Sequence, residues 1–296
     1  MASEIMTLRI GKVEVGGRLG EHPLVLAGSI FYHEHKIVKD HKRGVFDREA
    51  AEKLIVQQDE WSERTGIPCM VDVVGESVDA LCRYLDFVAD ITSSPILMNG
   101  TTADVRIGAL KYASEVGLLD RLVYTSINYT SEEYEFRALA EHGAKFVLVQ
   151  TFNPRNPLPR GSVEMFEGLM KGCLDVGVKG VIALSTVLDI PSMGYALETI
   201  KILKDRTGVP CAIAPCGVVV RWRRIKELGK DYRWVCMAAA IAMSRMMGAD
   251  LIIYGSIRKA PKVFPVSAMI EAIIAYNERL KYGWKLSREH PLFTYL

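Results

Sequence analysis

The sequence has few cysteines, and none of them stands in a recognisable motif. Its six cysteines are scattered along the chain: Cys69, Cys82, Cys173, Cys211, Cys216 and Cys236. No two form a Cys-x-x-Cys pair, which excludes the usual zinc-finger and thiol redox motifs. We therefore expect reduced, mostly buried thiols, as in a cytoplasmic protein.

Long apolar runs and a strong net charge are absent as well. The most apolar window, residues 234–243, ends after ten residues, whereas a span of a bilayer needs about 18 to 20. Residues 1–17 lack the basic flank and apolar run of a signal peptide. With 37 basic and 35 acidic residues, the net charge of +2 gives no reason to expect nucleic acid as a partner. We expect a cytoplasmic protein without membrane insertion.

What the sequence does contain is a regular alternation of short β-branched runs and amphipathic segments. The predicted strands cover residues 22–31, 68–75, 95–100, 121–128, 145–152, 180–189, 210–217 and 251–257. A helix after each strand requires parallel pairing. Eight such units in 296 residues match a TIM barrel, which needs about 250. We predict a single (β/α)8 barrel domain over residues 1–296.

Barrel active sites lie at the carboxyl ends of the strands, so the residues there are the candidates. Most are amides, carboxylates or hydroxyls: Asp72, Glu76, Asn99, Asn128, Gln150, Asn153, Ser185, Asp189 and Ser256. The set is poor in histidine. It is typical of a binding site for a polar, planar ligand rather than of a nucleophilic enzyme.

A His-x-His pair, His33 and His35, follows the first strand. In an extended chain both rings would point the same way, as in metal-dependent barrel hydrolases. Only His41 or Asp189 could supply the further ligand that a metal needs. We interpret the pair as polar residues of a long first loop and predict no metal site; the hydrolase that uses His33 and His35 is the alternative.

Carboxylates and amides from successive strands suit a heterocycle with an amidine-like edge. Two adjacent N–H donors of a 2-amino-4-oxopyrimidine pair with one carboxylate, and Asp72 is placed for this contact. The stretches "VDVVGES", "LMNGTT" and "TSIN" resemble those of pterin-binding barrels. That resemblance implies that Asp72, Asn99, Asn128 and Asp189 hold a pterin.

Longer stretches carry a closer resemblance. "GSIFYHEHKIVKDHKRGVFDREAAEKLI", "YLDFVADIT", "ALKYASEVGLLDRLVYTSIN" and "GADLIIYGSIRKAPKVFPVSAMIEAI" are similar to the MtrH subunit of tetrahydromethanopterin S-methyltransferase and its soluble bacterial relatives. The resemblance implies a homodimeric methyltransferase that moves a methyl group between methylcobalamin or another corrinoid, carried by a separate protein, and N5 of a tetrahydropterin.

The same resemblance leaves two pterins open. Archaeal members use tetrahydromethanopterin and bacterial relatives use tetrahydrofolate. This chain has Asp72 where the archaeal members have Gln, and Asn99 where they have Asp. We therefore predict tetrahydrofolate, with tetrahydromethanopterin as the alternative.

Roles for the candidate residues follow from this chemistry. An amide beside N5 can accept or donate a hydrogen bond by rotating. We predict Asn128 and Asp189 as the catalytic residues. The expected pterin-binding set comprises Asp72, Glu76, Asn99, Asn128, Gln150, Ser185 and Asp189.

Basic residues crowd the segment after the seventh strand, which we predict to be a loop: Arg221, Arg223, Arg224, Lys226, Lys230 and Arg233. It either docks an acidic corrinoid protein or folate carboxylates, or is a solvated surface loop. Cys216, at the end of the seventh strand, either faces the corrinoid or is a buried thiol.

Overall fold

Alternation of side chains explains why the strands of this chain close into a barrel. In the computed structural model, which describes residues 4–295, Val25 and Ala27 belong to the apolar cluster inside the barrel. Leu26, between them, belongs to the cluster that packs against the helices. The other strands repeat this pattern, because successive residues of a strand point to opposite faces.

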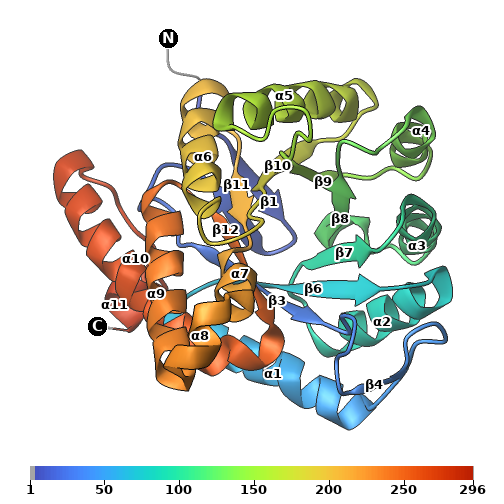
Figure 1. Ribbon diagram of the computed structural model, residues 1–296, viewed down its shortest axis with the longest axis horizontal. Coiled ribbons are helices and arrows are strands. Elements are labelled where there is room, and N and C mark those ends of the chain that lie inside the picture. The colour runs from blue at the N-terminus through green and yellow to red at the C-terminus, as the bar shows by residue number, and fades with distance from the viewer. Residues whose placement is uncertain (1–3, 296) are drawn as a thin grey trace.

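Parallel strands form the closed barrel, and the first pairs with the last (Figure 1). In chain order they are β3 (Val25–Ile30), β6 (Cys69–Gly75), β7 (Ile96–Gly100), β8 (Leu122–Ile127), β9 (Phe146–Gln150), β10 (Gly180–Ser185), β11 (Cys211–Ile213) and β12 (Leu251–Ser256). All eight lie within the predicted ranges. The structure is a single domain with a TIM barrel, as predicted.

Helices surround the barrel, and several begin at a side chain that accepts a hydrogen bond from the first turn. Asp47, Ser77 and Thr102 act in this way for α1, α2 and α3. The helices are α1 (Arg48–Thr65), α2 (Val78–Ile91), α3 (Ala103–Glu115), α4 (Glu133–Glu141), α5 (Pro159–Asp175), α6 (Met193–Thr207), α7 (Pro215–Arg221), α8 (Arg223–Leu228), α9 (Lys230–Met246), α10 (Ala260–Tyr282) and α11 (Pro291–Thr294). Two short 3₁₀ turns complete the set, η1 (Leu119–Arg121) and η2 (Ile257–Lys259). No helix within residues 4–295 is long and apolar enough to cross a membrane.

Two small hairpins were not predicted. One pairs β1 (Thr7–Ile10) with β2 (Val13–Gly16), and the other pairs β4 (Val38–Asp40) with β5 (Val45–Phe46). Ile10 and Val13 of the first hairpin join the interior cluster of the barrel. The backbone N–H of Gly11 donates to the carbonyl of Asp120, which precedes β8. This hairpin therefore closes the amino end and leaves the carboxyl end as the mouth.

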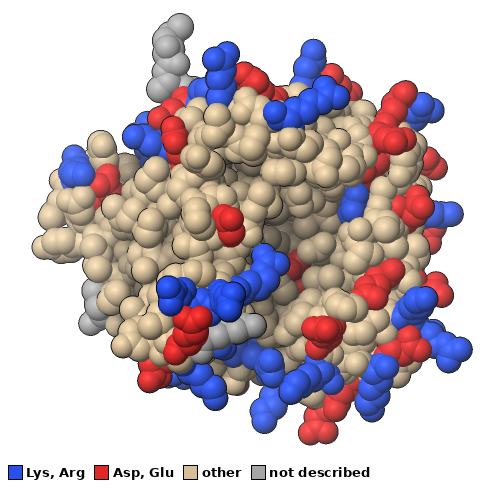
Figure 2. Space-filling view, viewed as in Figure 1, with Lys and Arg blue, Asp and Glu red and all other residues tan. Residues whose placement is uncertain are grey.

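The region after β11 differs from the prediction. The strand ends at Ile213, and the segment expected to be a loop forms α7, α8 and the start of α9. Pro215 at the start of α7 explains the early helix, since proline favours the first helical turn. Figure 2 shows Lys and Arg side chains gathered over α8, beside a hollow near the centre of this face. The side chain of Lys226 lies outside the described part of the chain.

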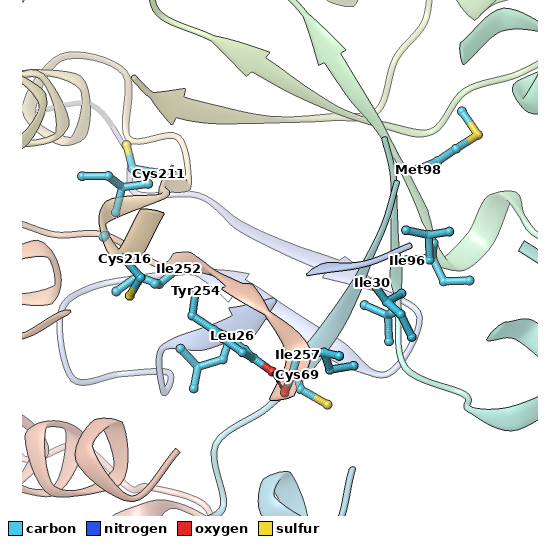
Figure 3. Packing of buried hydrophobic residues seen from close by; sticks show 14 of the residues in the cluster. Leu26, Ile30, Cys69, Ile96, Met98, Cys211, Cys216, Ile252, Tyr254 and Ile257 are labelled. Atoms are coloured by element: carbon cyan, nitrogen blue, oxygen red, sulfur yellow. Dashed lines mark hydrogen bonds between the residues drawn. The ribbon is translucent and has the colours of Figure 1, made fainter. Parts of the chain in front are cut away.

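Buried thiols lie on the outer side of the barrel. Figure 3 shows Cys69 near Tyr254, and Cys211 and Cys216 near Ile252. All six cysteines are free, and four are buried, which confirms the expectation of mostly buried thiols. Burial raises the pKa of Cys216 to about 12, so this thiol is neither exposed nor ionised.

Candidate active site

Asp72, the middle residue of β6, lies at the centre of the candidate site. It pairs in register with Ser29 of β3, and the next strand, β7, presents Asn99 beside it. The hydroxyl of Ser29 donates to Oδ2 of Asp72 over 2.5 Å. The amide of Asn99 donates to Oδ1 over 3.1 Å. Two of the predicted residues, Asp72 and Asn99, are thus brought together. Ser29 belongs to the same group but was not predicted from the sequence.

The carboxyl group of Asp72 is buried, with 3% of the residue exposed. Burial raises its pKa, because desolvation disfavours the charged form, and the bonds from Ser29 and Asn99 oppose that rise. No ion pair to Asp72 exists among the described residues. A carboxylate has about four acceptor positions, and the neighbours use two. Asp72 can therefore still accept two adjacent N–H donors from a ligand.

Two further polar side chains at the mouth lack partners within residues 4–295. Gln150 ends β9 at an inward position and its amide makes no described hydrogen bond. Thr186, just after β10, continues the inward alternation of Ile182 and Leu184. Its hydroxyl is buried without a partner. Because buried polar groups are normally paired, the hydroxyl of Thr186 fits a site that a polar ligand completes, and the half-buried amide of Gln150 is free to bind the same ligand.

Asn128 is less free than its predicted role requires. Its Oδ1 accepts from the backbone N–H of Thr130 over 2.9 Å and from the hydroxyl of Thr130 over 2.6 Å. Its backbone N–H donates to the hydroxyl of Ser131. Rotation of the amide, as predicted, would break both bonds to Thr130. Only the Nδ2 group, whose contact with Ser126 is long at 3.5 Å, is available to a ligand.

Ser185 and Asp189 lie away from Asp72. Ser185 shares the outward face of β10 with Ala183, and its hydroxyl donates to the carbonyl of Ala196 on α6. Ser185 thus faces the helix layer and is not brought together with Asp72, so its predicted pterin contact stays a prediction without support from this placement. Asp189 is exposed in the turn before α6 and accepts from the backbone N–H of Ser192 over 2.8 Å.

That backbone hydrogen bond lowers the pKa of Asp189 and ties its carboxylate to the turn. No described contact joins Asp189 to Asp72 or Asn99. Its place at the rim does not support the predicted catalytic role. The strand was predicted to continue to residue 189, whereas β10 ends at Ser185, which explains why Asp189 lies at the rim.

The sequence pattern of one family, the MtrH subunit of tetrahydromethanopterin S-methyltransferase, matches residues 3–285. This chain belongs to that family. It is 37% identical to the H subunit of tetrahydromethanopterin S-methyltransferase from Methanopyrus kandleri, with 88% of each chain covered. The same subunit of Methanothermobacter thermautotrophicus is 34% identical, over 99% of this chain and 98% of the relative. The H subunit of a putative mtx methyltransferase from Methanosarcina barkeri is 34% identical, over 96% of both.

Solved structures show the fold of this MtrH-family chain in more distant proteins. Dihydropteroate synthase of Yersinia pestis superposes with a TM-score of 0.63, at 13% identity, over 91% of this chain and 99% of the synthase. A truncated 3-deoxy-D-arabino-heptulosonate 7-phosphate synthase of Thermotoga maritima gives 0.52 at 16% identity, over 96% and 95%. At these identities the likeness is one of fold alone.

The first loop of the MtrH-family chain brings Glu76 close to two histidines. Nδ1 of His33 lies 2.8 Å from a carboxylate oxygen of Glu76, and Nδ1 of His41 lies 3.6 Å from the same oxygen. The bond to Glu76 raises the pKa of His33, whose side chain is 80% exposed. Glu76 is thus engaged at the surface, and no described contact joins it to Asp72.

His35 lies in a different environment from His33. It is 2% exposed, its ring stacks on Tyr32, and its Nδ1 accepts from the backbone N–H of Phe31 over 3.1 Å. Burial lowers its pKa to about 4. The two rings do not share one direction, as the metal-dependent alternative would require, because Phe31 and Glu34 adopt left-handed φ angles of 61° and 63° that turn the loop. Within residues 4–295, no three His, Cys, Asp or Glu side chains are grouped as metal ligands.

Helices α7 and α8, which carry basic residues, form one side of a surface groove near the mouth. Arg221, Trp222 and Arg223 line this groove together with Asp189 and Pro191. Arg221 and Arg223 are exposed and form no ion pair with another described residue. These helices therefore present free positive charge at the rim.

Proposed function

We propose that this chain transfers a methyl group between a corrinoid held by a separate protein and N5 of a tetrahydropterin. The single observation that carries the proposal is the buried carboxylate of Asp72, which Ser29 and Asn99 hold at the barrel mouth with acceptor positions to spare. Membership of the methyltransferase family supports the reaction class. A pterin presents the two adjacent N–H groups that such a carboxylate binds.

The reaction is a displacement at the methyl carbon. The cobalt–carbon bond of methyl-Co(III) breaks, both electrons stay on cobalt to give Co(I), and a nitrogen–carbon bond forms at N5, which then releases its proton. The enzyme supplies no covalent nucleophile in this displacement. Its contribution is to fix the pterin so that the N5 lone pair faces the methyl carbon, which lowers the entropic part of the barrier.

Proton handling at N5 falls to the amides at the mouth. Gln150 is free to rotate and can accept the N5 proton in a hydrogen bond or donate to the N5 lone pair. Asn128 is restricted to donation through Nδ2 by its bonds to Thr130. We assign Gln150 to the N5 contact and Asn128 to positioning the pterin from the neighbouring strand.

Tetrahydromethanopterin is the pterin that the relatives' names favour, and we propose it as the substrate. Tetrahydrofolate, predicted from the sequence, is the second candidate. Both compounds carry the same 2-amino-4-oxo edge, so Asp72 binds either of them equally well. The choice between them therefore depends on contacts to the tail.

The experiment that tests the proposal mixes the protein anaerobically with methylcob(III)alamin and each pterin in turn. Absorbance follows the formation of cob(I)alamin. We expect formation that requires both protein and pterin, faster with tetrahydromethanopterin. Absence of cob(I)alamin with both pterins, also when the corrinoid is supplied on its carrier protein, would refute the proposal.

The corrinoid carrier is the proposed macromolecular partner of the groove beside α7 and α8. Arg221 and Arg223 are exposed at its edge, and their charge fits an acidic protein surface. The groove lies at the mouth, where a docked carrier would bring its methyl group to the pterin.

A second copy of the chain is the proposed occupant of an apolar face on α10. Met269, Ile273, Tyr276 and Leu280 recur at helical spacing, and each is more than half exposed. A twofold axis would pack this stripe against itself. We expect a dimer by light scattering. Ile273→Glu should give monomers, whereas Leu174→Glu on α5 should not; a monomeric wild type would refute the dimer.

A further inference from the structure

Three cationic side chains gather at the carboxyl end of β12 without a counter-charge. They are Arg258 and Lys259 of η2 and Arg233 of α9, and none forms an ion pair with a described residue. The ammonium of Lys259 folds back to donate to the carbonyl of Tyr254 over 3.0 Å. It lies 3.1 Å from the place that a Cβ on Gly255 would take. Burial lowers the pKa of Lys259, and the neighbouring guanidinium groups of Arg233 and Arg258 lower it further.

Two buried donors of this cluster, one of them on a cation itself, have no acceptor in the described part of the chain. One is Nε of Arg233. The other is Nε2 of His35, which must carry the ring's proton because Nδ1 accepts from Phe31. An unsatisfied buried donor costs about 1–3 kcal/mol, so two of them next to unpaired cations are expensive for the fold alone.

Tyr32 places His35 at the same strand end as the cations. The ring of His35 stacks on Tyr32 at 4.4 Å, and the hydroxyl of Tyr32 donates to Oγ of Ser256 over 3.0 Å. Ser256 is the last residue of β12 and directly precedes η2. His35 also feels the positive charge of Arg258, which helps to lower its pKa.

The register of the barrel gives the position of this cluster relative to Asp72. Ser29 of β3 pairs with Asp72 of β6 on one side and with Ser256 of β12 on the other. Two strand spacings, about 10 Å, therefore separate Asp72 from the end of β12. The mouth has a carboxylate that accepts hydrogen bonds on one side and a group of cationic and unpaired donors on the other.

We propose that Arg233, Lys259 and His35 form an anion subsite that binds the negatively charged tail of the tetrahydropterin. The inference rests on the proposed function and deepens it. Pterin coenzymes carry donors on the pyrimidine edge and carboxylate or phosphate groups on the tail, which matches the two sides of the mouth. Arginine and lysine bind both kinds of anion, and a neutral imidazole adds one donor.

The test compares pterins with and without a tail by calorimetric titration. Wild type, Arg233→Gln and Lys259→Met are titrated with tetrahydromethanopterin, tetrahydrofolate and tail-less 6-methyltetrahydropterin. Each variant should lose roughly tenfold or more in affinity for the tailed pterins, since a hydrogen bond to a charged group is worth about 1.5–3 kcal/mol. Affinity for the tail-less pterin should not change. The tailed pterin that suffers the larger loss is the one whose tail the subsite contacts more strongly.

Matched variants separate a binding role from a structural one. Lys262→Met removes one exposed positive charge next to η2 and should alter no affinity. Arg233→Lys keeps the charge and should recover part of the loss. Equal losses for tailed and tail-less pterins, or no loss for either, would overturn the subsite.

Failure of the proposed function can be told apart from failure of the subsite. If wild type binds no pterin, the proposed function is wrong. Titration with p-aminobenzoylglutamate and with inorganic phosphate then tests the subsite alone. Binding of one anion that is lost in Arg233→Gln would support an anion site, and binding of neither would overturn it.

Discussion

Two buried groups of charged and polar side chains lie at opposite ends of the barrel, and they differ in how completely they are paired. At the amino end, Arg245 donates to Glu271 over 2.6 Å and lies 3.6 Å from Asp250. Lys204 donates to Asp250 over 2.8 Å, and the backbone N–H of Cys211 adds another bond to that carboxylate. Each charge in this network has an opposite charge within the chain.

At the mouth the pairing is incomplete. Asp72 has no cation, the side-chain amide of Gln150 and the hydroxyl of Thr186 have no described hydrogen-bond partner, and Arg233 and His35 each retain a buried free donor. Both ends remove polar groups from water, but only the amino end compensates for that within the protein. The amino-end network therefore serves stability, whereas the mouth is complementary to a polar ligand, as expected for the two ends of a TIM barrel.

Breaking the paired network should have the largest effect on stability. Arg245→Met leaves Glu271 as a buried carboxylate without a cation, although Asp250 keeps its pair with Lys204, and we expect a loss of about 3–5 kcal/mol in the free energy of unfolding by urea. Arg224→Met, which removes an exposed pair with Glu227, should have little effect. A similar small loss for both variants would contradict the role assigned to the amino end.

At the mouth, removal of a charge should stabilise the fold. The pKa of Asp72 is raised in the folded state, so the folded protein binds its proton more tightly than the unfolded chain. That contribution is present at low pH and is lost as the pH rises through the folded pKa. Asp72→Asn should therefore raise the urea midpoint at pH 7, and its advantage should shrink towards pH 4. A lower midpoint at pH 7 would show that Asp72 serves the fold.

Charge reversal at the rim should act on partner binding and not on stability. Arg223→Glu should raise KM for the corrinoid carrier several-fold and leave turnover with free methylcobalamin unchanged, because rim charges govern encounter. Lys171→Glu on α5 makes the same change of charge on an exposed helix away from the groove. An equal rise in KM for both variants would indicate a non-specific effect of net charge.

The smallest effect is expected in the first loop. His33 is exposed and bonded to Glu76, so His33→Ala and treatment with a chelator should leave methyl transfer unchanged. Loss of activity on chelation, restored by zinc, would instead favour the metal-dependent alternative.

The barrel and several polar residues of its mouth could be predicted from the sequence. Apolar alternation gives the barrel strands, and their carboxyl ends include Asp72, Asn99 and Gln150. Position at a strand end did not show which side of the barrel Ser185 faces. Ile182 and Leu184 of β10 face the barrel interior, so Ser185 faces outward.

Other features depend on contacts that no local pattern encodes. Lys259 reaches the mouth by folding back from a 3₁₀ turn, and Arg233 reaches it from a helix in a segment that was predicted to be a loop. Lys259 has no sequence signal, and Arg233 stands out in the sequence only as one of the basic residues after the seventh strand, whereas Thr186 could have been found by extending the inward alternation of its strand. The cytoplasmic location stays a prediction.

The role of Asp72 in holding the pterin is tested by a calorimetric titration of tetrahydropterin into wild type, Asp72→Asn and Asp59→Asn. Asp59 accepts a hydrogen bond from Ser94 outside the barrel and serves as a matched carboxylate. Loss of a charged acceptor should weaken binding to Asp72→Asn by roughly 10- to 100-fold, and Asp59→Asn should bind like wild type. Equal affinity of Asp72→Asn and wild type would contradict the assignment of Asp72 to the pyrimidine edge of the pterin.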